Sequence, residues 1–254
     1  MDSTNLPGNL PRPDADAPLP SRGRFIRRQR RLLIWLLAGA LILLTVGLSV
    51  AATFVDYFAA DLWLTHSIQR LTNPAFRALM IAVTWPGNPP RGLLMTLLAA
   101  ALLALLKLRF EALYLLGCSG GGALLTNLVK LSIARPRPTA GLVEVYSVLH
   151  SNSFPSGHVV NYVSVYGLLF YFAYVLAPHS SWRAATLCFC GGMVALVGLS
   201  RVYLGAHWAS DVIGGYCFGL IWLLLVIAHY ARFRARRLAQ SAGAGSLGAP
   251  QGQV

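Results

Sequence analysis

Long runs of uncharged apolar residues constrain this chain more than any other feature of its sequence. Five runs contain 17 to 24 residues without a charged side chain: residues 32–55, 112–129, 159–177, 184–200 and 212–231. A helix of about 20 residues crosses the roughly 30 Å hydrocarbon core of a membrane. The runs are apolar on nearly all sides, which is typical of helices surrounded by lipid and not of helices on a soluble domain.

A sixth, weaker run begins near Gly92 and is interrupted by Lys107 after 15 uncharged residues. It reaches spanning length only if Lys107 lies at the membrane edge and extends its ammonium group to the headgroups. With this run included, we predict an all-α fold, a polytopic membrane bundle of six transmembrane helices. The low share of charged residues, 11% of 254, agrees with a membrane protein.

The distribution of Lys and Arg predicts the orientation of this bundle. An even number of spans places both termini on one side. Fourteen of the 21 basic residues fall on that side, before the first span, after the sixth, or in the turns after spans two and four. The positive-inside rule identifies this side as the cytoplasm. We therefore expect a protein of the cell (inner) membrane with both termini cytoplasmic, and interpret the net charge of +13 as topology and not as nucleic-acid binding.

Composition divides the chain into one membrane domain, residues 32–231, and two basic tails. Residues 1–31 are Pro-rich before an Arg cluster, and residues 232–254 end in small residues, so we expect both as disordered cytoplasmic tails. The first span could be a cleavable signal peptide, but its apolar run exceeds the usual 7–15 residues, which favours a retained anchor. Residues 56–91 form an outer segment, predicted as an interfacial aromatic helix or as a route for a lipid.

Charged and polar residues gather at the span ends that meet the non-cytoplasmic side. The third and fifth spans leave the membrane there, and the fourth and sixth re-enter it. Parity therefore brings six residues to one face: Lys130, Arg137, His158, Arg201, His207 and Asp211. Ser156 and Gly157 directly precede His158, where the fourth span begins.

This set of residues suits the transfer of a phosphoryl group. Three cations match a multiply charged anion, and a helix that begins after Pro155-Ser156-Gly157 offers backbone N–H groups to its oxygens. His207 and Asp211 are four residues apart, so the carboxylate can hold one ring nitrogen and leave the other free to attack. His158 can donate a proton to a departing oxygen, and the chemistry needs no metal.

Each of these residues also has an ordinary explanation. Lys and Arg at helix ends are usually anchors at the headgroups, and a single His at a span boundary is usually interfacial. The joint occurrence on one face favours a site. Arg135 is ambiguous, as a further phosphate contact or a ligand of lipid headgroups.

The spacing of these residues resembles a known signature. The signature has three parts. The first is Lys130, then six residues, then Arg137-Pro138, and the second is Pro-Ser-Gly-His ending at His158. The third begins with Ser200-Arg201, continues after five residues with His207, and ends after three more with Asp211. Over residues 130–211 this resembles the type 2 phosphatidic acid phosphatases, a superfamily that includes the vanadium haloperoxidases and glucose-6-phosphatase.

The resemblance implies a role for each residue. His207 would form a phosphohistidine, Asp211 would orient it, and His158 would protonate the leaving group and then activate water. The phosphate oxygens would be held by the remaining members of the set: Lys130, Arg137, Ser156, the Gly157 amide and Arg201. Neither a metal nor a cofactor is expected. Membrane members of the family act on lipids at the outer membrane surface.

We therefore expect metal-independent hydrolysis of a terminal phosphate from a lipid phosphate or pyrophosphate at the outward-facing side. Candidate substrates are a polyprenyl pyrophosphate such as undecaprenyl pyrophosphate, phosphatidic acid and phosphatidylglycerol phosphate. A lipid phosphotransferase with the same intermediate is the alternative, and a catalytically silent lipid-binding or transport protein is a weaker one. The sequence does not predict the lipid or the oligomeric state.

Overall fold

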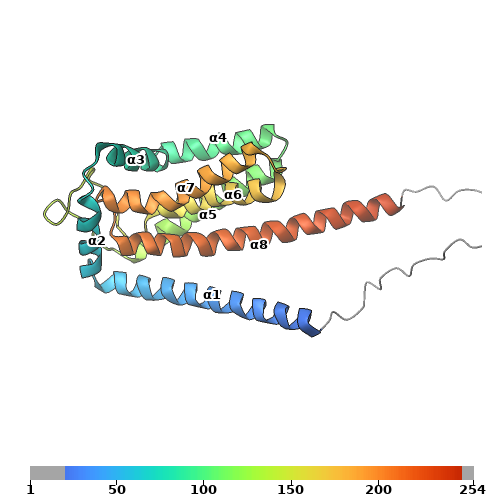
Figure 1. The fold of residues 1–254 in the computed structure, drawn as a ribbon, viewed down its shortest axis with the longest axis horizontal. Coiled ribbons are helices and arrows are strands. Elements are labelled where there is room, and N and C mark those ends of the chain that lie inside the picture. The colour runs from blue at the N-terminus through green and yellow to red at the C-terminus, as the bar shows by residue number, and fades with distance from the viewer. Residues whose placement is uncertain (1–20, 248–254) are drawn as a thin grey trace, which may run out of the picture. The chain divides into compact units, whose positions relative to one another are not determined.

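The computed structural model describes residues 21–247, except for the side chains of residues 21–28, 30, 31 and 241–247. Within this range the regular elements are helical, which confirms the predicted all-α fold (Figure 1). In chain order they are α1 (Ser21–Phe54), α2 (Ala59–Gln69), α3 (Pro74–Thr84), the short 3₁₀ helix η1 (Trp85–Gly87), α4 (Arg91–Leu105), α5 (Arg109–Ser132), α6 (Gly157–Leu176), α7 (Ser181–Tyr203) and α8 (Ala209–Leu247).

Five helical segments are long and apolar enough to cross a membrane: Leu32–Phe54, Arg109–Ser132, Gly157–Leu176, Ser181–Tyr203 and Ala209–Gln240. The sixth crossing differs from the prediction. Helix α4 has only 15 residues, and Lys107 does not prolong it, because this residue adopts a left-handed backbone conformation (φ 64°) after the helix has ended.

Two consecutive helical pieces, Pro74–Gly87 and Arg91–Leu105, are long and apolar enough only when taken together, and they are bent by 70° relative to each other, as in a broken span or a re-entrant loop. Three prolines lie at the break, Pro86, Pro89 and Pro90. Proline lacks the N–H that would continue a helix and clashes with the preceding turn, so the chain bends here. Residues 74–87 therefore form one half of a bent apolar pair with α4, where the sequence suggested an interfacial helix or a route for a lipid.

The helices at both ends of the chain also extend beyond the expected domain limits of 32 and 231. Helix α1 begins at Ser21 and α8 continues to Leu247, so residues 21–31 and 232–247 are helical where disordered tails were expected. The Arg-rich stretches there are good helix formers and contain no proline between residues 21 and 31 or between 232 and 247. The remaining parts of both expected tails, residues 1–20 and 248–254, lie outside the described residues.

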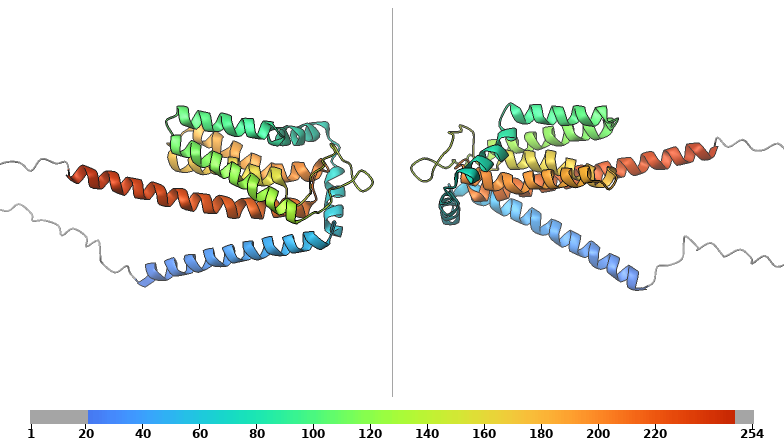
Figure 2. Two further views of the ribbon diagram at one scale, coloured as in Figure 1. Left: turned by 180° about the vertical axis from the view of Figure 1, so that it is seen from behind. Right: turned by 45° about the horizontal axis from the view of Figure 1, so that its top comes forward.

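The chain divides into two units, residues 1–40 and residues 41–254, and the second carries the bundle. In this unit α4 to α8 lie alongside one another, and α2 crosses one end of them (Figures 1 and 2). Helix α6 is central, because it packs against α5, α7 and α8. Its buried Tyr162 and Leu168 join Leu115 of α5 and Val197 of α7 in the core. Leucines on the outer faces of the helices are exposed, as expected for contact with lipid.

Two neighbouring glycines of α5 give a matched test of the contact between α5 and α8. A Cβ atom added to Gly121 would clash with the Trp222 ring, whereas one added to Gly120 would meet nothing within 4 Å. Overpacking typically costs about 1–3 kcal/mol. We expect Gly121→Ala to lower the midpoint of thermal unfolding in detergent, measured by tryptophan fluorescence, and Gly120→Ala to leave it unchanged or raise it. Equal shifts in both variants would contradict the close contact.

Candidate active site

The ends of four helices meet around a loop of residues 133–156. Helices α5 and α7 end here, and α6 and α8 begin here. The backbone N–H of Ser156, the N-cap residue of α6, donates to the carbonyl oxygen of Asp211 in the first turn of α8 at 3.0 Å. This bond joins the starts of the two helices, so that residues about 50 positions apart in the sequence form one site.

His207 and Asp211 form a buried pair at the start of α8. Their exposed fractions are 2% and 0%. His207 Nδ1 lies 3.6 Å from Asp211 Oδ2, a contact longer than a hydrogen bond. This oxygen accepts hydrogen bonds from Ser153 Oγ (2.5 Å) and the Trp208 backbone N–H (3.0 Å). The other carboxylate oxygen, Oδ1, accepts from Arg135 at 2.6 Å. Asp211 is therefore held from several sides and faces the imidazole with one oxygen.

The surroundings of His207 determine which of its nitrogens carries the proton. Its Nε2 lies 3.1 Å from a guanidinium nitrogen of Arg137, which can only donate, so Nε2 presents its lone pair. Nδ1 then carries the proton, on the side of Asp211. Burial, and then the charges of Arg137, Arg201 and Lys130, lower the pKa of His207 well below its ordinary value of 6.5. The ring is thus neutral at neutral pH, and its Nε2 lone pair points to the Arg137 guanidinium.

The three predicted cations come from three different segments and share this location. Arg137 binds the carbonyl oxygens of Ser151 (2.6 Å) and Ala206 (2.7 Å). Lys130 donates to the carbonyl oxygens of Asn152 and Ser153. Arg201 is buried and donates to Thr84 Oγ1 at 2.6 Å. The charges of all three act on His207, and Arg137 lies in direct contact with its ring.

Two buried donors in this region have no hydrogen-bond partner within the described residues. They are the hydroxyl of Ser156 and Nε of Arg201. A buried donor without a partner is costly, and the cost disappears when an acceptor binds. A phosphate group has the oxygens and the charge to bind both. Within residues 21–247, no group of three or more His, Cys, Asp and Glu side chains could hold a metal ion.

His158 lies in the first turn of α6 and is coupled to the break between α3 and α4. Its Nε2 lies 2.9 Å from Asn88 Oδ1, and it is close enough to interact with the charge of Arg201 and with the ring of His207. A Cβ atom added to Gly87 would lie 2.7 Å from the His158 ring, so only glycine fits there. The break therefore supplies the side chains beside the predicted proton donor.

Sequence reasoning missed the residues that hold the site together. Thr84 and Asn88 come from the break, and Pro86, Pro89 and Pro90 were the signal that could have indicated it. Arg135 is neither a phosphate contact nor a headgroup ligand, the two alternatives considered: it is 2% exposed and bonded to carboxylates. Asp61, Ser153 and Ser210 complete that cluster, and nothing in their sequence spacing identifies them.

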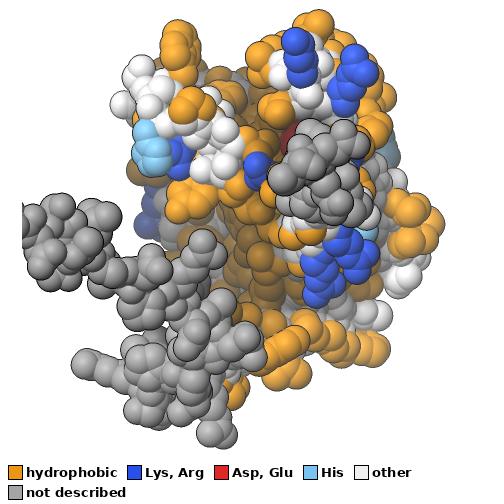
Figure 3. Space-filling view, turned by 90° about the vertical axis from the view of Figure 1, so that its right-hand side faces the viewer, with side chains coloured by type: hydrophobic (Ala, Val, Ile, Leu, Met, Phe, Trp, Pro, Cys, Tyr) orange, Lys and Arg blue, Asp and Glu red, His pale blue; other side chains and the backbone are white. Residues whose placement is uncertain are grey.

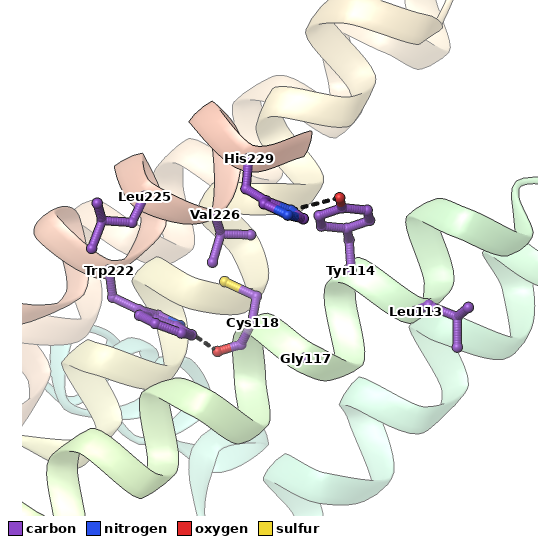
Figure 4. A pocket seen from close by; sticks show the side chains of 8 residues that line it. All are labelled: Leu113, Tyr114, Gly117, Cys118, Trp222, Leu225, Val226 and His229. Atoms are coloured by element: carbon purple, nitrogen blue, oxygen red, sulfur yellow. Dashed lines mark hydrogen bonds between the residues drawn. The ribbon is translucent and has the colours of Figure 1, made fainter. Parts of the chain in front are cut away.

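An apolar recess of about 450 Å³ lies elsewhere, between α5 and α8 (Figure 4). Trp222 donates to the Cys118 carbonyl oxygen at 2.8 Å, and Tyr114 is hydrogen-bonded to His229 at 2.8 Å. None of the eight predicted site residues lines this recess. It has the apolar character of the membrane interior and lacks the cations that the site around His207 contains.

Comparison with known proteins identifies the same segment. The family model of the PAP2 superfamily matches residues 111–235, which include every predicted site residue. Phosphatidylglycerophosphatase B of Bacillus subtilis is 32% identical over 170 residues, which cover 66% of this chain and 82% of that protein. Lipid A 1-phosphatase of Rhizobium johnstonii is 35% identical over 119 residues, 43% of each chain.

A solved structure has a similar fold. The crystal structure of a transmembrane PAP2 type phosphatidylglycerolphosphate phosphatase from Bacillus subtilis matches with a TM-score of 0.67 and 27% sequence identity. The match covers 77% of this chain and 96% of that one. The similarity therefore extends over most of the bundle and is not confined to the three signature segments.

Proposed function

Since this chain belongs to the PAP2 superfamily and is a membrane phosphatase, we propose that it removes the terminal phosphate of a lipid phosphate or pyrophosphate through a phosphohistidine at His207. The observation that carries this proposal is the buried imidazole whose Nε2 faces the Arg137 guanidinium at 3.1 Å, while the charges of Arg201 and Lys130 also act on the ring. Such a nitrogen is a nucleophile, and the cations would stabilise the charge on the transferring group.

The chemical steps use only the residues of the site. His207 Nε2 attacks phosphorus, the N–P bond forms, and the bond from phosphorus to the lipid oxygen breaks. His158 gives its proton to the leaving oxygen and then takes one from the water that attacks the phosphohistidine. This second attack releases inorganic phosphate and restores the imidazole. Asp211 stabilises the positive charge that His207 carries as the intermediate.

The phosphate is held by the cations and by the start of α6. Arg201 would offer its unpartnered Nε and Ser156 its unpartnered hydroxyl. The backbone N–H of Gly157, at the first position of α6, would add a further donor and the positive end of the helix dipole. Arg137 and Lys130 would complete the set from the loop and from α5.

We further propose that this site faces outward and that both termini are cytoplasmic. Helix α1, the broken α3–α4 pair and α5 to α8 amount to six crossings when the pair counts as one. Lys107, Arg109 and Arg183 lie at the turns opposite the site. Figure 3 views the side of the molecule on the right of Figure 1, where Lys and Arg side chains stand among hydrophobic ones. This pattern favours a cytoplasmic position for that end. The membrane domain would then be residues 32–231.

The identity of the lipid substrate is a separate question, which a panel of lipids can test. The two relatives are named for phosphatidylglycerophosphate and lipid A, which supports testing several lipids that share a terminal phosphate. The panel would contain phosphatidic acid, phosphatidylglycerol phosphate, undecaprenyl pyrophosphate and a lipid A 1-phosphate. We expect detergent-purified protein to release free phosphate from at least one of them, in the presence of a chelator. Failure on all four, with the protein folded, would contradict the proposal.

The same assay separates hydrolysis from transfer. Both reactions would pass through the same phosphohistidine, and they differ in the acceptor of the phosphoryl group. A phosphatase transfers the group to water and releases free phosphate, whereas a lipid phosphotransferase transfers it to a second lipid. Counting both products with a second lipid present therefore decides between the two. A protein that binds the lipids and forms neither product would be the silent lipid-binding protein.

The environment of His207 predicts the pH dependence. His207 must be neutral to attack and His158 protonated to donate, so we expect a bell-shaped profile of kcat/KM. Because burial and the nearby cations lower the pKa of His207, activity should persist as pH falls below 6.5 and be lost only in more acidic solution. The measurement is kcat/KM from pH 4 to 10, with ionisation of the substrate followed separately by ³¹P NMR. An acidic limb at or above pH 6.5 would contradict the neutral, cation-surrounded imidazole.

A further inference from the structure

A second set of charges lies directly behind the His207–Asp211 pair. The guanidinium of Arg135 is fully buried and bridges two carboxylates, Asp211 at 2.6 Å and Asp61 of α2 at 3.1 Å. It also donates to Ser210 Oγ at 2.7 Å and, through Nε, to the carbonyl oxygens of Val55 and Asp56 at 3.1 Å. Arg135 thus joins the outer segment after α1 to the start of α8.

Asp61 is the other centre of this set. Its Oδ1 accepts from the Ser210 backbone N–H at 2.8 Å, and its Oδ2 accepts from Ser210 Oγ at 2.7 Å and from the Phe58 backbone N–H at 3.1 Å. Ser210 is the second residue of α8, so a carboxylate from another helix caps the N-terminus of α8. Asp61 is 2% exposed, and solvent therefore does not screen its charge.

We propose that Asp61 and Arg135 are positioning residues that set the orientation and the effective charge of Asp211, and through it the basicity of His207. The proposal rests on the proposed function only for its link to turnover. It assigns a role to α2, which carries Asp61. It also extends the His207–Asp211 pair at the start of α8 to a set of four ionisable groups, by adding Asp61 and Arg135.

The physical reason is that one guanidinium is shared between two carboxylates. Asp61 neutralises part of the charge of Arg135, so Asp211 keeps more of its own negative charge for His207. Loss of the Asp61 charge would leave Arg135 bound to Asp211 alone. Asp211 would then stabilise a positive His207 less well, both when it is protonated and when it carries the phosphoryl group. The imidazole would become less basic and the intermediate less stable.

Other groups also face His207 and remain unchanged in this comparison. Ser153 lies at 3.4 Å from Nδ1, and Arg137 at 3.1 Å from Nε2. The charges of Lys130 and Arg201 act on the ring from α5 and α7, and His158 of α6 lies close enough to interact with it. Among the described residues none of them is hydrogen-bonded to Asp61, and Ser153 meets Arg135 through its backbone N–H, which donates to the Arg135 carbonyl oxygen at 2.8 Å. Replacing the Asp61 side chain therefore removes no bond of theirs.

The test compares Asp61→Asn with Asp56→Asn, which loses the same charge at an exposed side chain of the same segment. Asp56 meets Arg135 through its backbone carbonyl oxygen, which the substitution keeps. We expect Asp61→Asn to lower kcat roughly 10- to 100-fold, as loss of a group that orients a reactive residue typically does, with KM nearly unchanged. The pKa of His207, followed by NMR titration and assigned with His207→Gln, should fall. Asp56→Asn should change neither quantity. Equal kcat and equal titration in the two variants would overturn the proposal.

A double variant keeps the proposal testable if Asp61→Asn is poorly folded. Asp61→Asn/Arg135→Gln removes one negative and one positive charge and leaves the full charge of Asp211 for His207. The pKa of His207 in the double variant should lie above that of Asp61→Asn, or above that of the wild type if the single variant does not fold. A purely structural role predicts no such rise, and a pKa at or below the reference value would refute the inference. A folded wild type that releases no phosphate would defeat the proposed function but not this inference, since the titration requires no turnover.

Discussion

His207→Gln is expected to reduce phosphate release by roughly 10⁴-fold or more, because loss of a covalent nucleophile removes the whole two-step pathway. Glutamine is close in size and polar, so the buried position beside Asp211 and Arg137 keeps hydrogen-bonding partners. The measurement is the initial rate of phosphate release with the best lipid of the panel. Unchanged thermal unfolding would show that the loss is chemical and not structural.

Trapping experiments extend this prediction to the intermediate. Wild-type protein quenched in alkali during turnover of a ³²P-labelled lipid should carry acid-labile label, and His207→Gln should carry none. His158→Gln should accumulate label when the leaving group needs no proton, because the attack of water on the phosphohistidine is then slow. The matched control is His66→Gln, an exposed histidine on α2, which should behave as wild type. Label retained in His207→Gln would assign the nucleophile to another residue.

Arg201→Lys is expected to lower kcat/KM by about 10²- to 10³-fold, the usual effect of removing one donor aimed at a developing charge. Lysine keeps the positive charge but loses the planar group with its unpartnered Nε. If only charge mattered, the substitution would have little effect. The comparison therefore separates the geometry of the guanidinium from its electrostatic contribution.

The control for this variant is Arg77→Lys, the same substitution at an exposed position of α3. It should retain wild-type kcat/KM and wild-type stability. Thr84→Val provides a second comparison, because Thr84 Oγ1 accepts from Arg201 at 2.6 Å and its loss would free the guanidinium to move. A smaller decrease in Thr84→Val than in Arg201→Lys would indicate direct phosphate contact by Arg201. Wild-type activity in Arg201→Lys would remove this residue from the phosphate-binding set.

The crossings that the sequence predicted well are those with an unbroken apolar run. The runs at 112–129, 159–177, 184–200 and 212–231 all lie within or nearly within α5 to α8. The absence of charge in such a run is a local signal, because contact with lipid requires an apolar side chain at each position independently of the others. The run that begins near Gly92 was placed less accurately. It is only the second piece of a bent pair, and the prolines between the two pieces hide their connection in the sequence.

The site was predictable to the extent that its residues follow a fixed spacing along the chain. His207 and Asp211 share a helix start, and parity brought the ends of four spans to one face. Asp61, Thr84 and Asn88 were not predictable in this way, because each reaches the site from a segment with no spacing that relates it to His207. Arg135 had a visible charge, but its role depends on two carboxylates that are 74 and 76 residues away.

By itself, the sequence determined that this chain is an all-helical membrane protein and which residue types could perform phosphoryl transfer, because hydrophobicity and motif spacing are properties of short segments. Only the tertiary structure decided that the α3–α4 break supplies partners to Arg201 and His158, and that Asp61 and Arg135 support Asp211 from behind. Those relations arise when distant segments are buried together, since a charged or polar group removed from water must find its partners wherever the fold brings them.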